Sequence, residues 1–448
     1  MRRRHHLPRS ISRRELLKNS ALAGAGIGFA RAGLVRPARA AETTVTFAGW
    51  AFEPQVVEAN VQRFMEQNPA IEVNYTPLDL QLYNEKMVAL FNAGAEPDAF
   101  YVRDINLGAW VEAGWLQPID GRDGLAELNE AMYPFNREAL FYKGQQYGTP
   151  YYGDIYVYMY DKKALADAGV ASPPVTLDQL ANAALEVKKA GIAEYPILKG
   201  YKTNVDGLDE FWSMVLASGG HLFDDDLNPV YPDEDQTALG VLEWMLEAMH
   251  GSKILDPLGL ELDETQARDV FLSGQGTFTS NVGNVFPRVN NPEYSQRAGN
   301  IQMTRFPGLQ DTGIGPMGWT RLYGMSVNTE APDAAWQLMY YMGGKDADGV
   351  YYTAKDWYLK YGVGYCFKSL DSDPDIVAAQ EAAGYDLEVR SQQYGSARER
   401  ENIKAPWYDE WDRFTQQQIQ NALLRQVTPK EALSASAERA RELKEEWE

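Results

Sequence analysis

Two tyrosines and an aspartate stand together at the start of an apolar segment. Tyr151, Tyr152 and Asp154 follow a turn, and residues 155–160 (IYVYMY) are apolar, β-branched or aromatic. A segment without a polar face is typical of a strand that is buried on both sides. Aromatic rings and a carboxylate at the mouth of this strand would suit a cleft for a small ligand. The alternative is a core strand with two tyrosines at its edge.

The sequence offers little for metal or redox chemistry. Cys366 is the only cysteine, which excludes a disulfide framework and a thiolate metal site. His221 and His250 are far apart in the chain, and each is expected to be structural. The acidic runs 224–226 and 233–235 lack the ligand spacing of a calcium loop, so a solvated turn is favoured over bound calcium. We therefore expect neither a cofactor nor a metal.

The first forty residues differ in composition from the rest. Residues 12–18 (SRRELLK) resemble a twin-arginine export signal, and residues 38–40 (ARA) suit cleavage of a signal peptide at 1–40. Without the ten basic residues and one acidic residue of this segment, the chain carries 32 Lys and Arg against 62 Asp and Glu, a net charge of −30. Such a charge disfavours nucleic acid and anionic membranes as partners. No later segment approaches about 18 continuous apolar residues, so we expect a soluble periplasmic protein.

The elements that would position the candidate residues alternate between strand and helix. Residues 44–47, 71–75 and 98–102 have the composition of short strands, and residues 53–67 show the apolar spacing of a helix. This alternation predicts βαβ units on a mostly parallel sheet. A chain of 448 residues is long enough for two or more such domains, each with its own core.

Eight short motifs, in this order, resemble the extracellular solute-binding proteins of bacterial ABC importers, in the carbohydrate-type family 1. They are Thr44–Trp50 (TVTFAGW), Phe64–Val73 (FMEQNPAIEV), Gly94–Phe100 (GAEPDAF), Gly114–Asp120 (GWLQPID), Tyr147–Pro150 (YGTP), Met159–Lys162 (MYDK), Pro174–Leu180 (PVTLDQL) and Phe271–Phe278 (FLSGQGTF). Asp161 stands where asparagine is usual, Leu177 where tryptophan is usual and Gly276 where alanine is usual. Each motif alone is weak, so the resemblance depends on their order.

The resemblance implies an α/β fold with two lobes, the type II fold of periplasmic binding proteins. Each lobe would be a mostly parallel sheet flanked by helices, and crossing strands would form the hinge. The first crossing would lie near residues 155–160 and a second near 299–305. The expected N-terminal lobe is 42–156 with 304–350, and the expected C-terminal lobe is 157–303 with 351–448.

The resemblance also implies a sugar site just beyond the strand ends, which is the usual crevice of open α/β sheets. Aromatic rings would cover the flat faces of a sugar, while carboxylates, amides and guanidinium groups would bind its hydroxyls. The candidate contacts are Trp50, Phe52, Arg103, Asp104, Tyr151, Tyr152, Asp154, Asp209, Trp212, Asn281, Asn284, Trp319 and Arg321.

The candidates differ in how well a structural role explains them. Trp50 follows a strand beside a glycine, where it has little reason to be core. Trp212 has apolar neighbours on a helix, so core packing explains it equally well. Arg321 could pair with a surface carboxylate, and Asn281 and Asn284 could serve a turn.

The function implied by the resemblance is that of a receptor without catalysis. Such a protein would bind a sugar or short oligosaccharide as a monomer, close by a hinge motion and deliver the ligand to a membrane permease. The main alternative is a secreted glycoside hydrolase, which needs two facing carboxylates. A binding protein for a sugar phosphate, an acidic sugar or a polyol is a further alternative, which Arg103 and Arg321 leave open. A redox protein is disfavoured, because the mature chain has no C-x-x-C and no G-x-G-x-x-G after a strand.

Overall fold

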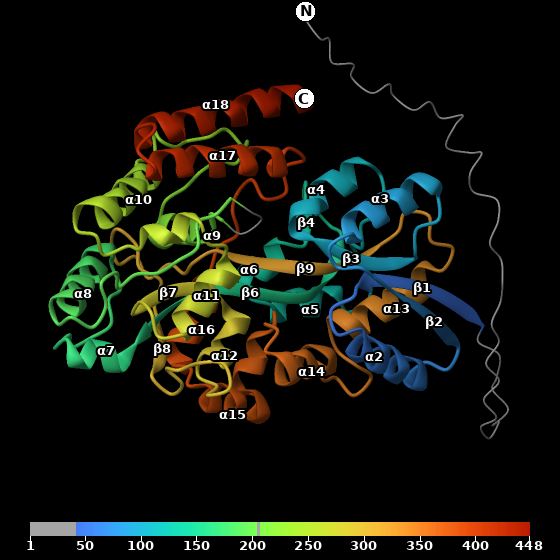
Figure 1. Ribbon diagram of the computed structural model, residues 1–448. Coiled ribbons are helices and arrows are strands. Elements are labelled where there is room, and N and C mark those ends of the chain that lie inside the picture. The colour runs from blue at the N-terminus through green and yellow to red at the C-terminus, as the bar shows by residue number, and fades with distance from the viewer. Residues whose placement is uncertain (1–41, 204–206) are drawn as a thin grey trace, which may run out of the picture. The chain divides into compact units, whose positions relative to one another are not determined.

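β-Branched and aromatic residues form the strands of a seven-stranded sheet with the order β2-β1-β3-β9-β6-β7, to which β8 adds on β6 (Figure 1). The structure is a computed structural model that describes residues 42–203 and 207–448. The export signal predicted at 1–40 lies outside these residues. The strands are β1 (Thr43–Trp50), β2 (Ile71–Leu78), β3 (Ala99–Arg103), β4 (Phe141–Tyr142), β5 (Gln145–Gln146), β6 (Gly148–Asp161), β7 (Phe278–Val282), β8 (Ile301–Thr304) and β9 (Gly318–Met325).

Helices surround this sheet, and none of those in the described part of the chain is long and apolar enough to cross a membrane. The longest, α18, begins with a capping box between Thr428 and Glu431. The α-helices are α2 (Pro54–Gln67), α3 (Tyr83–Ala93), α4 (Asp104–Glu112), α5 (Leu125–Ala131), α6 (Pro134–Glu138), α7 (Lys162–Asp167), α8 (Leu177–Lys189), α9 (Asp209–Ala217), α10 (Thr237–Leu246), α11 (Glu264–Leu272), α12 (Phe286–Val289), α13 (Pro332–Gly343), α14 (Tyr352–Tyr361), α15 (Pro374–Ala383), α16 (Leu387–Ser396), α17 (Tyr408–Leu423) and α18 (Pro429–Trp447).

Strand pairing is parallel at one end of the sheet and antiparallel elsewhere. β1 pairs in parallel with β2, where Val45 faces Val73, and with β3, where Phe47 faces Ala99. The helices α2 and α3 provide the crossovers that parallel neighbours require. β9 returns antiparallel against β3 and β6, and β7 and β8 also run antiparallel to β6. The predicted βαβ alternation is therefore found in β1–β3, whereas the expectation of mostly parallel pairing does not extend to β6–β9.

β6 is a single strand that belongs to both halves of the sheet. Its first part pairs with β9, from Gly148 opposite Gly324 to Ile155 opposite Gly318. Its second part, from Tyr156 onward, pairs with β7 and β8 instead. The chain therefore crosses between the halves at Ile155 and Tyr156, within the range predicted for the first crossing.

The second crossing lies later in the chain than predicted. Residues after β8 stay with the second half, because Leu177 donates its N–H to Gly308 (2.8 Å) and Leu309 donates its N–H to Ser218 Oγ (2.8 Å). Met317 still contacts the second part of β6, because its carbonyl accepts from the N–H of Tyr156 (3.1 Å). The chain joins the first part of the sheet only at Gly318, which lies opposite Ile155 at the start of β9. Gly318 N–H in turn donates to the carbonyl of Arg398 (2.9 Å), so the segment between α16 and α17 adjoins this crossing.

Two clusters of buried side chains form the cores. Alternate residues of β6 enter different clusters: Val157 and Met159 the first, Tyr156 and Tyr158 the second. This explains why the strand has no polar face. Buried residues of 351–397 belong to the first cluster, whereas those from Ile403 to Leu443 belong to the second. The lobe boundaries given above stay a prediction, since residues 41–448 form one compact unit.

Candidate ligand-binding cleft

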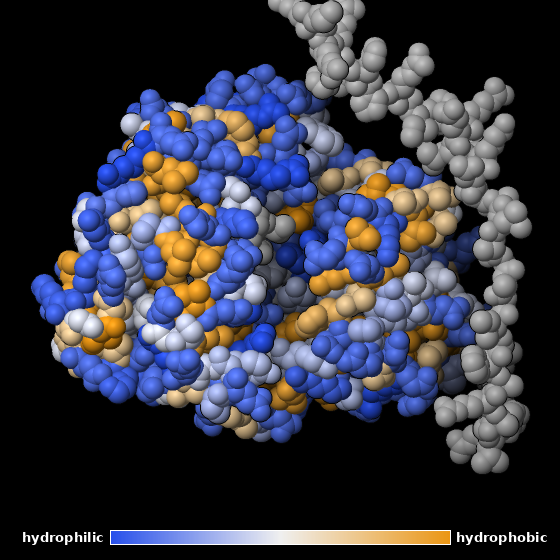
Figure 2. Space-filling view, in the orientation of Figure 1, coloured by the Kyte–Doolittle hydropathy of each residue, from blue (hydrophilic) through white to orange (hydrophobic). Residues whose placement is uncertain are grey.

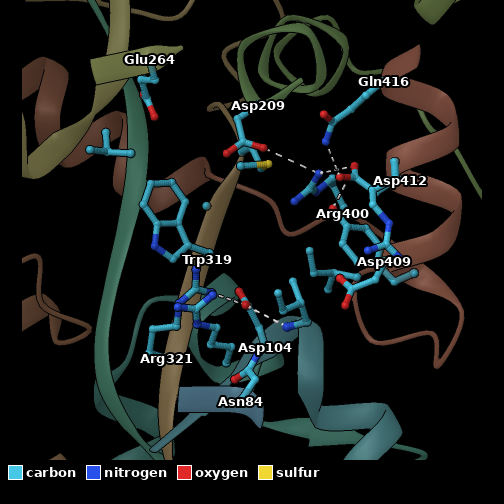
Figure 3. A pocket seen from close by; sticks show the side chains of 18 of the residues that line it. Asn84, Asp104, Asp209, Glu264, Trp319, Arg321, Arg400, Asp409, Asp412 and Gln416 are labelled. Carbon is cyan, nitrogen blue, oxygen red and sulfur yellow. Dashed lines mark hydrogen bonds and ion pairs between the residues drawn. The ribbon is translucent and has the colours of Figure 1, made fainter. Parts of the chain in front are cut away.

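A cavity of about 790 Å³ lies where the ends of β3 and β9 meet α9 and α17 (Figure 3). Figure 2 shows this face of the molecule hollowed between the residues of α17 and those of α3 and α4, with hydrophilic residues inside the hollow. Most side chains around the cavity carry charges or hydrogen-bonding groups. They include Asn84, Arg103, Asp104, Tyr152, Asp209, Glu264, Asn284, Trp319, Arg321, Arg400, Tyr408, Asp409, Asp412, Arg413, Gln416 and Gln417.

Asp104 and Arg321 form an ion pair at the cavity wall, beside the last residue of β3. The pair arises from strand register, because β9 places Arg321 opposite Arg103, directly before Asp104. Asp104 is fully buried, and its two carboxylate oxygens accept from the N–H groups of Ile105 (2.9 Å) and Thr320 (3.3 Å). The carboxylate is thus engaged by its neighbours, and its effect on the cavity is to hold the Arg321 guanidinium in place.

Arg400 forms the corresponding centre on the opposite wall. Its guanidinium lies 3.7 Å from Asp209 at the start of α9 and 3.5 Å from Asp412 on α17. It also lies over the ring of Tyr408, 5.0 Å from the ring centroid. Burial raises the pKa of Asp412, and the positive charge of Arg400 opposes this shift. Two elements far apart in sequence are joined in this way at the cavity wall.

Aromatic rings complete the wall between these two charged centres. Trp319 is partly exposed at the cavity, and its ring lies 5.8 Å from that of Tyr156 in an edge-on arrangement. Tyr152 lies on the neighbouring strand, opposite Arg321 in the β6–β9 register. Rings with one face toward a cavity and guanidinium groups beside them are suited to bind flat C–H faces bordered by hydroxyls.

Seven of the predicted residues line this cavity, although the chain separates them by more than two hundred positions. Two of the other candidates line a neighbouring cavity, which Asn284 also borders. The first set is Arg103, Asp104, Tyr152, Asp209, Asn284, Trp319 and Arg321, and the second is Phe52 and Asn281.

Trp50 and Tyr151 do not reach either cavity, contrary to prediction. Trp50 is only 5% exposed and packs against Tyr83, Tyr101 and Tyr151, with ring centroids 5.3, 4.6 and 5.7 Å away. Tyr151 stacks on Tyr101 at 4.4 Å. The last residue of β1 points into an aromatic core, because α3, β3 and β6 each bring one of these tyrosines to this end of the sheet.

Trp212 and Asp154 are also interior residues. Trp212 is fully buried and stacks on Trp411 of α17 at 5.8 Å, which is the core role left open by its apolar neighbours. Asp154 is buried at the crossing, where it accepts from Tyr394 Oη (2.6 Å) and from the N–H groups of Ile155 (2.9 Å) and Asn284 (3.0 Å). It therefore ties the crossing strand to α16 and to the segment after β7, and it lines neither cavity.

The residues that sequence reasoning missed come mainly from α17. Asp409, Asp412, Arg413 and Gln416 have the i, i+3, i+4, i+7 spacing of one helix face, and all four line the cavity. A polar stripe of this kind normally indicates a face in contact with solvent. Only the tertiary fold shows that it faces a cavity.

His221, His250 and the acidic turn have structural partners, and His221 Nδ1 lies 3.1 Å from the Glu401 carboxylate. His250 Nε2 lies 2.7 Å from the carbonyl of Leu423. Asp224 accepts from the N–H groups of Asp226 (3.0 Å) and Asn228 (2.7 Å), as in an Asx-type turn. Among the described residues, no three His, Cys, Asp or Glu side chains gather to hold a metal ion.

Comparison with known proteins gives a family match. Residues 52–349 match the model of the family described as bacterial extracellular solute-binding protein. The maltotriose-binding protein of Pyrococcus abyssi is 26% identical over 302 residues, which cover 64% of this chain and 59% of that protein. The diacetylchitobiose binding protein of Streptomyces coelicolor is 24% identical over 188 residues, 41% of each chain. The matched part thus spans less than two thirds of these relatives.

Solved structures show the same fold over most of the chain. The sugar-binding protein MalE from Xanthomonas citri has a TM-score of 0.74 at 20% identity, covering 90% of this chain and 98% of that one. The maltose-bound MalE3 of T. maritima has a TM-score of 0.72 at 20% identity, covering 90% of this chain and 100% of that one.

Proposed function

Because this chain belongs to the bacterial extracellular solute-binding protein family, we propose that it is the substrate-binding component of an ABC importer for a sugar or short oligosaccharide. The ligand would lie in the cavity between β3, β9 and α17 and would be delivered to the permease subunits in the membrane. The observation that carries this proposal is the set of aromatic and paired charged side chains around one cavity, to which both halves of the sheet contribute.

The charges around the cavity favour a neutral sugar over an acidic sugar or a sugar phosphate. Among the described residues, four arginines and five carboxylates line it. Arg321 pairs with Asp104, and Arg400 with Asp209 and Asp412. A phosphate would need an excess of positive charge, whereas alternating donors and acceptors suit the hydroxyls of an uncharged sugar.

We propose binding without hydrolysis. A glycoside hydrolase needs two carboxylates on opposite sides of one glycosidic bond. Asp104 and Asp209 each pair with an arginine, Glu264 pairs with the buried Lys199, and Asp154 lies outside the cavity. Asp409 and Asp412 are one turn apart on the same helix, so they would approach a ligand from the same side. Family relatives named for sugar binding support the same view.

The export signal supports delivery of this protein to the periplasm by the twin-arginine pathway. Residues 12–18 carry the paired arginines, and the family is described as extracellular. A strongly acidic mature chain is also consistent with a soluble carrier that works as a monomer beside its permease. These parts of the proposal rest on sequence and family alone.

A thermal-shift screen tests the proposal. Neutral sugars and oligosaccharides, including maltose, maltotriose and diacetylchitobiose, are compared with sugar phosphates, uronic acids and polyols. A ligand at one hundred times its Kd should stabilise the native state by about 2.7 kcal/mol, which raises the melting temperature by a few degrees. We expect the largest shift from a neutral saccharide, recovered intact after incubation. Stabilisation by phosphates or acidic sugars alone, or release of cleavage products, would contradict the proposal.

A further inference from the structure

A second compartment adjoins the first cavity and shares its wall. It has a volume of about 1040 Å³, and its lining includes Phe52, Arg268, Arg288, Tyr294 and Tyr361. Glu264, Val282 and Asn284 border both spaces. The loop after β1 and the end of α14 contribute one side, while α11 and α12 contribute the other. The cleft therefore continues well beyond the space that a single sugar unit would fill.

The second compartment contains an aromatic platform. Phe52 is 38% exposed, and its ring stacks on the buried Trp357 at 5.8 Å with an interplanar angle of 15°. Tyr361 is 36% exposed and lies 6.1 Å from Phe52 in an edge-on arrangement. Exposed rings that are fixed by a buried partner are suited to stack on the C–H faces of a sugar.

The loop that presents Phe52 is held in an unfavourable backbone conformation. Glu53 has φ 46° and ψ 55°, the left-handed region that residues other than glycine, asparagine and aspartate seldom adopt. Gln55 Nε2 donates to Tyr361 Oη (3.3 Å) and to the Glu53 carboxylate, which links this loop to α14. Such a conformation costs free energy and persists where surrounding contacts, here those of Gln55, hold it.

Fixed polar groups stand beside these rings. The carboxylate of Glu264, at the border of the two spaces, accepts from Tyr156 Oη (2.8 Å) and Lys199 Nζ (3.3 Å). Lys199 itself is buried, so this carboxylate is oriented from behind. Arg288 lies over the ring of Tyr294, 4.7 Å from its centroid. Aromatic faces with an oriented carboxylate and a stacked guanidinium repeat the chemistry of the first cavity.

We propose that the second compartment binds the outer units of a linear oligosaccharide whose other units occupy the first cavity. This rests on the proposed function and adds the class of ligand, a chain of several sugar units instead of a monosaccharide or polyol. A short sugar fills one space, whereas a longer chain passes Glu264 and stacks on Phe52 and Tyr361. Affinity then increases with chain length until both spaces are filled.

Calorimetric titration with two series, maltooligosaccharides and N-acetylchitooligosaccharides of two to six units, tests this inference. For the series that binds, we expect native affinity to rise at least tenfold from the two-unit sugar to the longer chains, equivalent to about 1.4 kcal/mol. In Phe52→Ala and Tyr361→Ala the ratio of long-chain to short-chain affinity should fall close to one. Phe52→Leu keeps the apolar contact with Trp357 but lacks the flat ring, so it should lose most of the ratio too.

The matched control is Leu424→Ala, which removes an apolar side chain of similar exposure, 47%, outside both spaces. The ratio should persist there. A ratio near one in the native protein, or one that survives in both aromatic variants, would overturn the second compartment while leaving sugar binding intact. Absence of binding to every saccharide, short or long, would overturn the proposed function and this inference with it.

Discussion

Asp104 shows how a residue can be located from sequence while the partners of its side chain cannot. Its position after a buried strand predicted a ligand contact, and it does line the cavity. Its carboxylate, however, is occupied by two backbone N–H groups and by Arg321. The pairing follows from the antiparallel register of β3 and β9, which lie more than two hundred residues apart. Sequence spacing cannot reveal a contact of that kind. We therefore propose Arg321 as a ligand contact that Asp104 positions.

Asp154 is a second residue whose chemistry depends on its surroundings. Burial raises its pKa to about 6, although Tyr394 and the N–H groups of Ile155 and Asn284 favour the charged form. The charged and titratable groups around it are Arg390 and Tyr394 of α16, Tyr358 of α14, Tyr152 of β6, Tyr385 and the buried Cys366 thiol. Ionisation of Asp154 at neutral pH therefore opposes folding.

We predict that Asp154→Asn becomes relatively more stabilising as the pH rises. A raised pKa means that the native state binds this proton more tightly than the unfolded chain, whose aspartates titrate near pH ~4. Native stability from this group is therefore complete at low pH and falls by about 1.4 kcal/mol per pH unit between pH ~4 and ~6. The uncharged variant lacks this loss. Urea unfolding at several pH values measures the free energy of unfolding of the variant and of the native protein. If the difference between the two stays constant from pH ~4 to ~6, the raised pKa of Asp154 is refuted.

At the scale of elements, composition identified β6 correctly because its two faces enter two different cores. Composition alone could not identify the polar face of α17 as a cavity wall, because such a stripe is normally typical of a solvated face. The position of Trp50 after a strand predicted that its ring would lie in the cleft. That position could not show that three tyrosines cover the ring. Local pattern predicts which element forms, and long-range packing decides which of its faces is exposed.

The contact between α4 and the segment leading to α17 gives a prediction at this scale. A Cβ at Gly108 would lie 1.8 Å from the carbonyl oxygen of Lys404, whereas a Cβ at Gly395 of α16 meets no heavy atom within 4 Å among the described residues. Alanine at either helical position gains about 0.5–1 kcal/mol of backbone entropy. Overpacking at Gly108 should cost about 1–3 kcal/mol, which outweighs this gain.

Gly108→Ala should therefore lower the free energy of unfolding, while Gly395→Ala should leave it unchanged or raise it by up to about 1 kcal/mol. Urea denaturation of the two variants beside the native protein measures both. Equal effects at the two positions would show that Lys404 does not pack against α4 as described. The segment between α16 and α17 would then be less closely attached to the first core.

At the scale of the whole molecule, the order of short motifs predicted the family and the two-part architecture. The family match and the structural similarity confirm both. The motifs could not predict where the second crossing lies, because residues 306–312 are held to α8 and α9 by contacts distant in sequence. Nor could the motifs predict that the C-terminal segment is divided, with residues 351–397 packing in the first core and residues 403–443 in the second. Such features depend on which surfaces the finished fold leaves available.

We propose that a saccharide binds at Arg321 and Arg400, the two cavity arginines that carboxylates hold in place. Calorimetric titration of Arg321→Lys with the sugar that gives the largest thermal shift tests it most directly. Lysine keeps the charge but lacks the planar fork that Asp104 orients, so we predict at least a tenfold loss of affinity, about 1.4 kcal/mol. In Arg305→Lys, whose arginine pairs with Asp311 outside both cavities, affinity should stay native. Native affinity in Arg321→Lys would contradict the account.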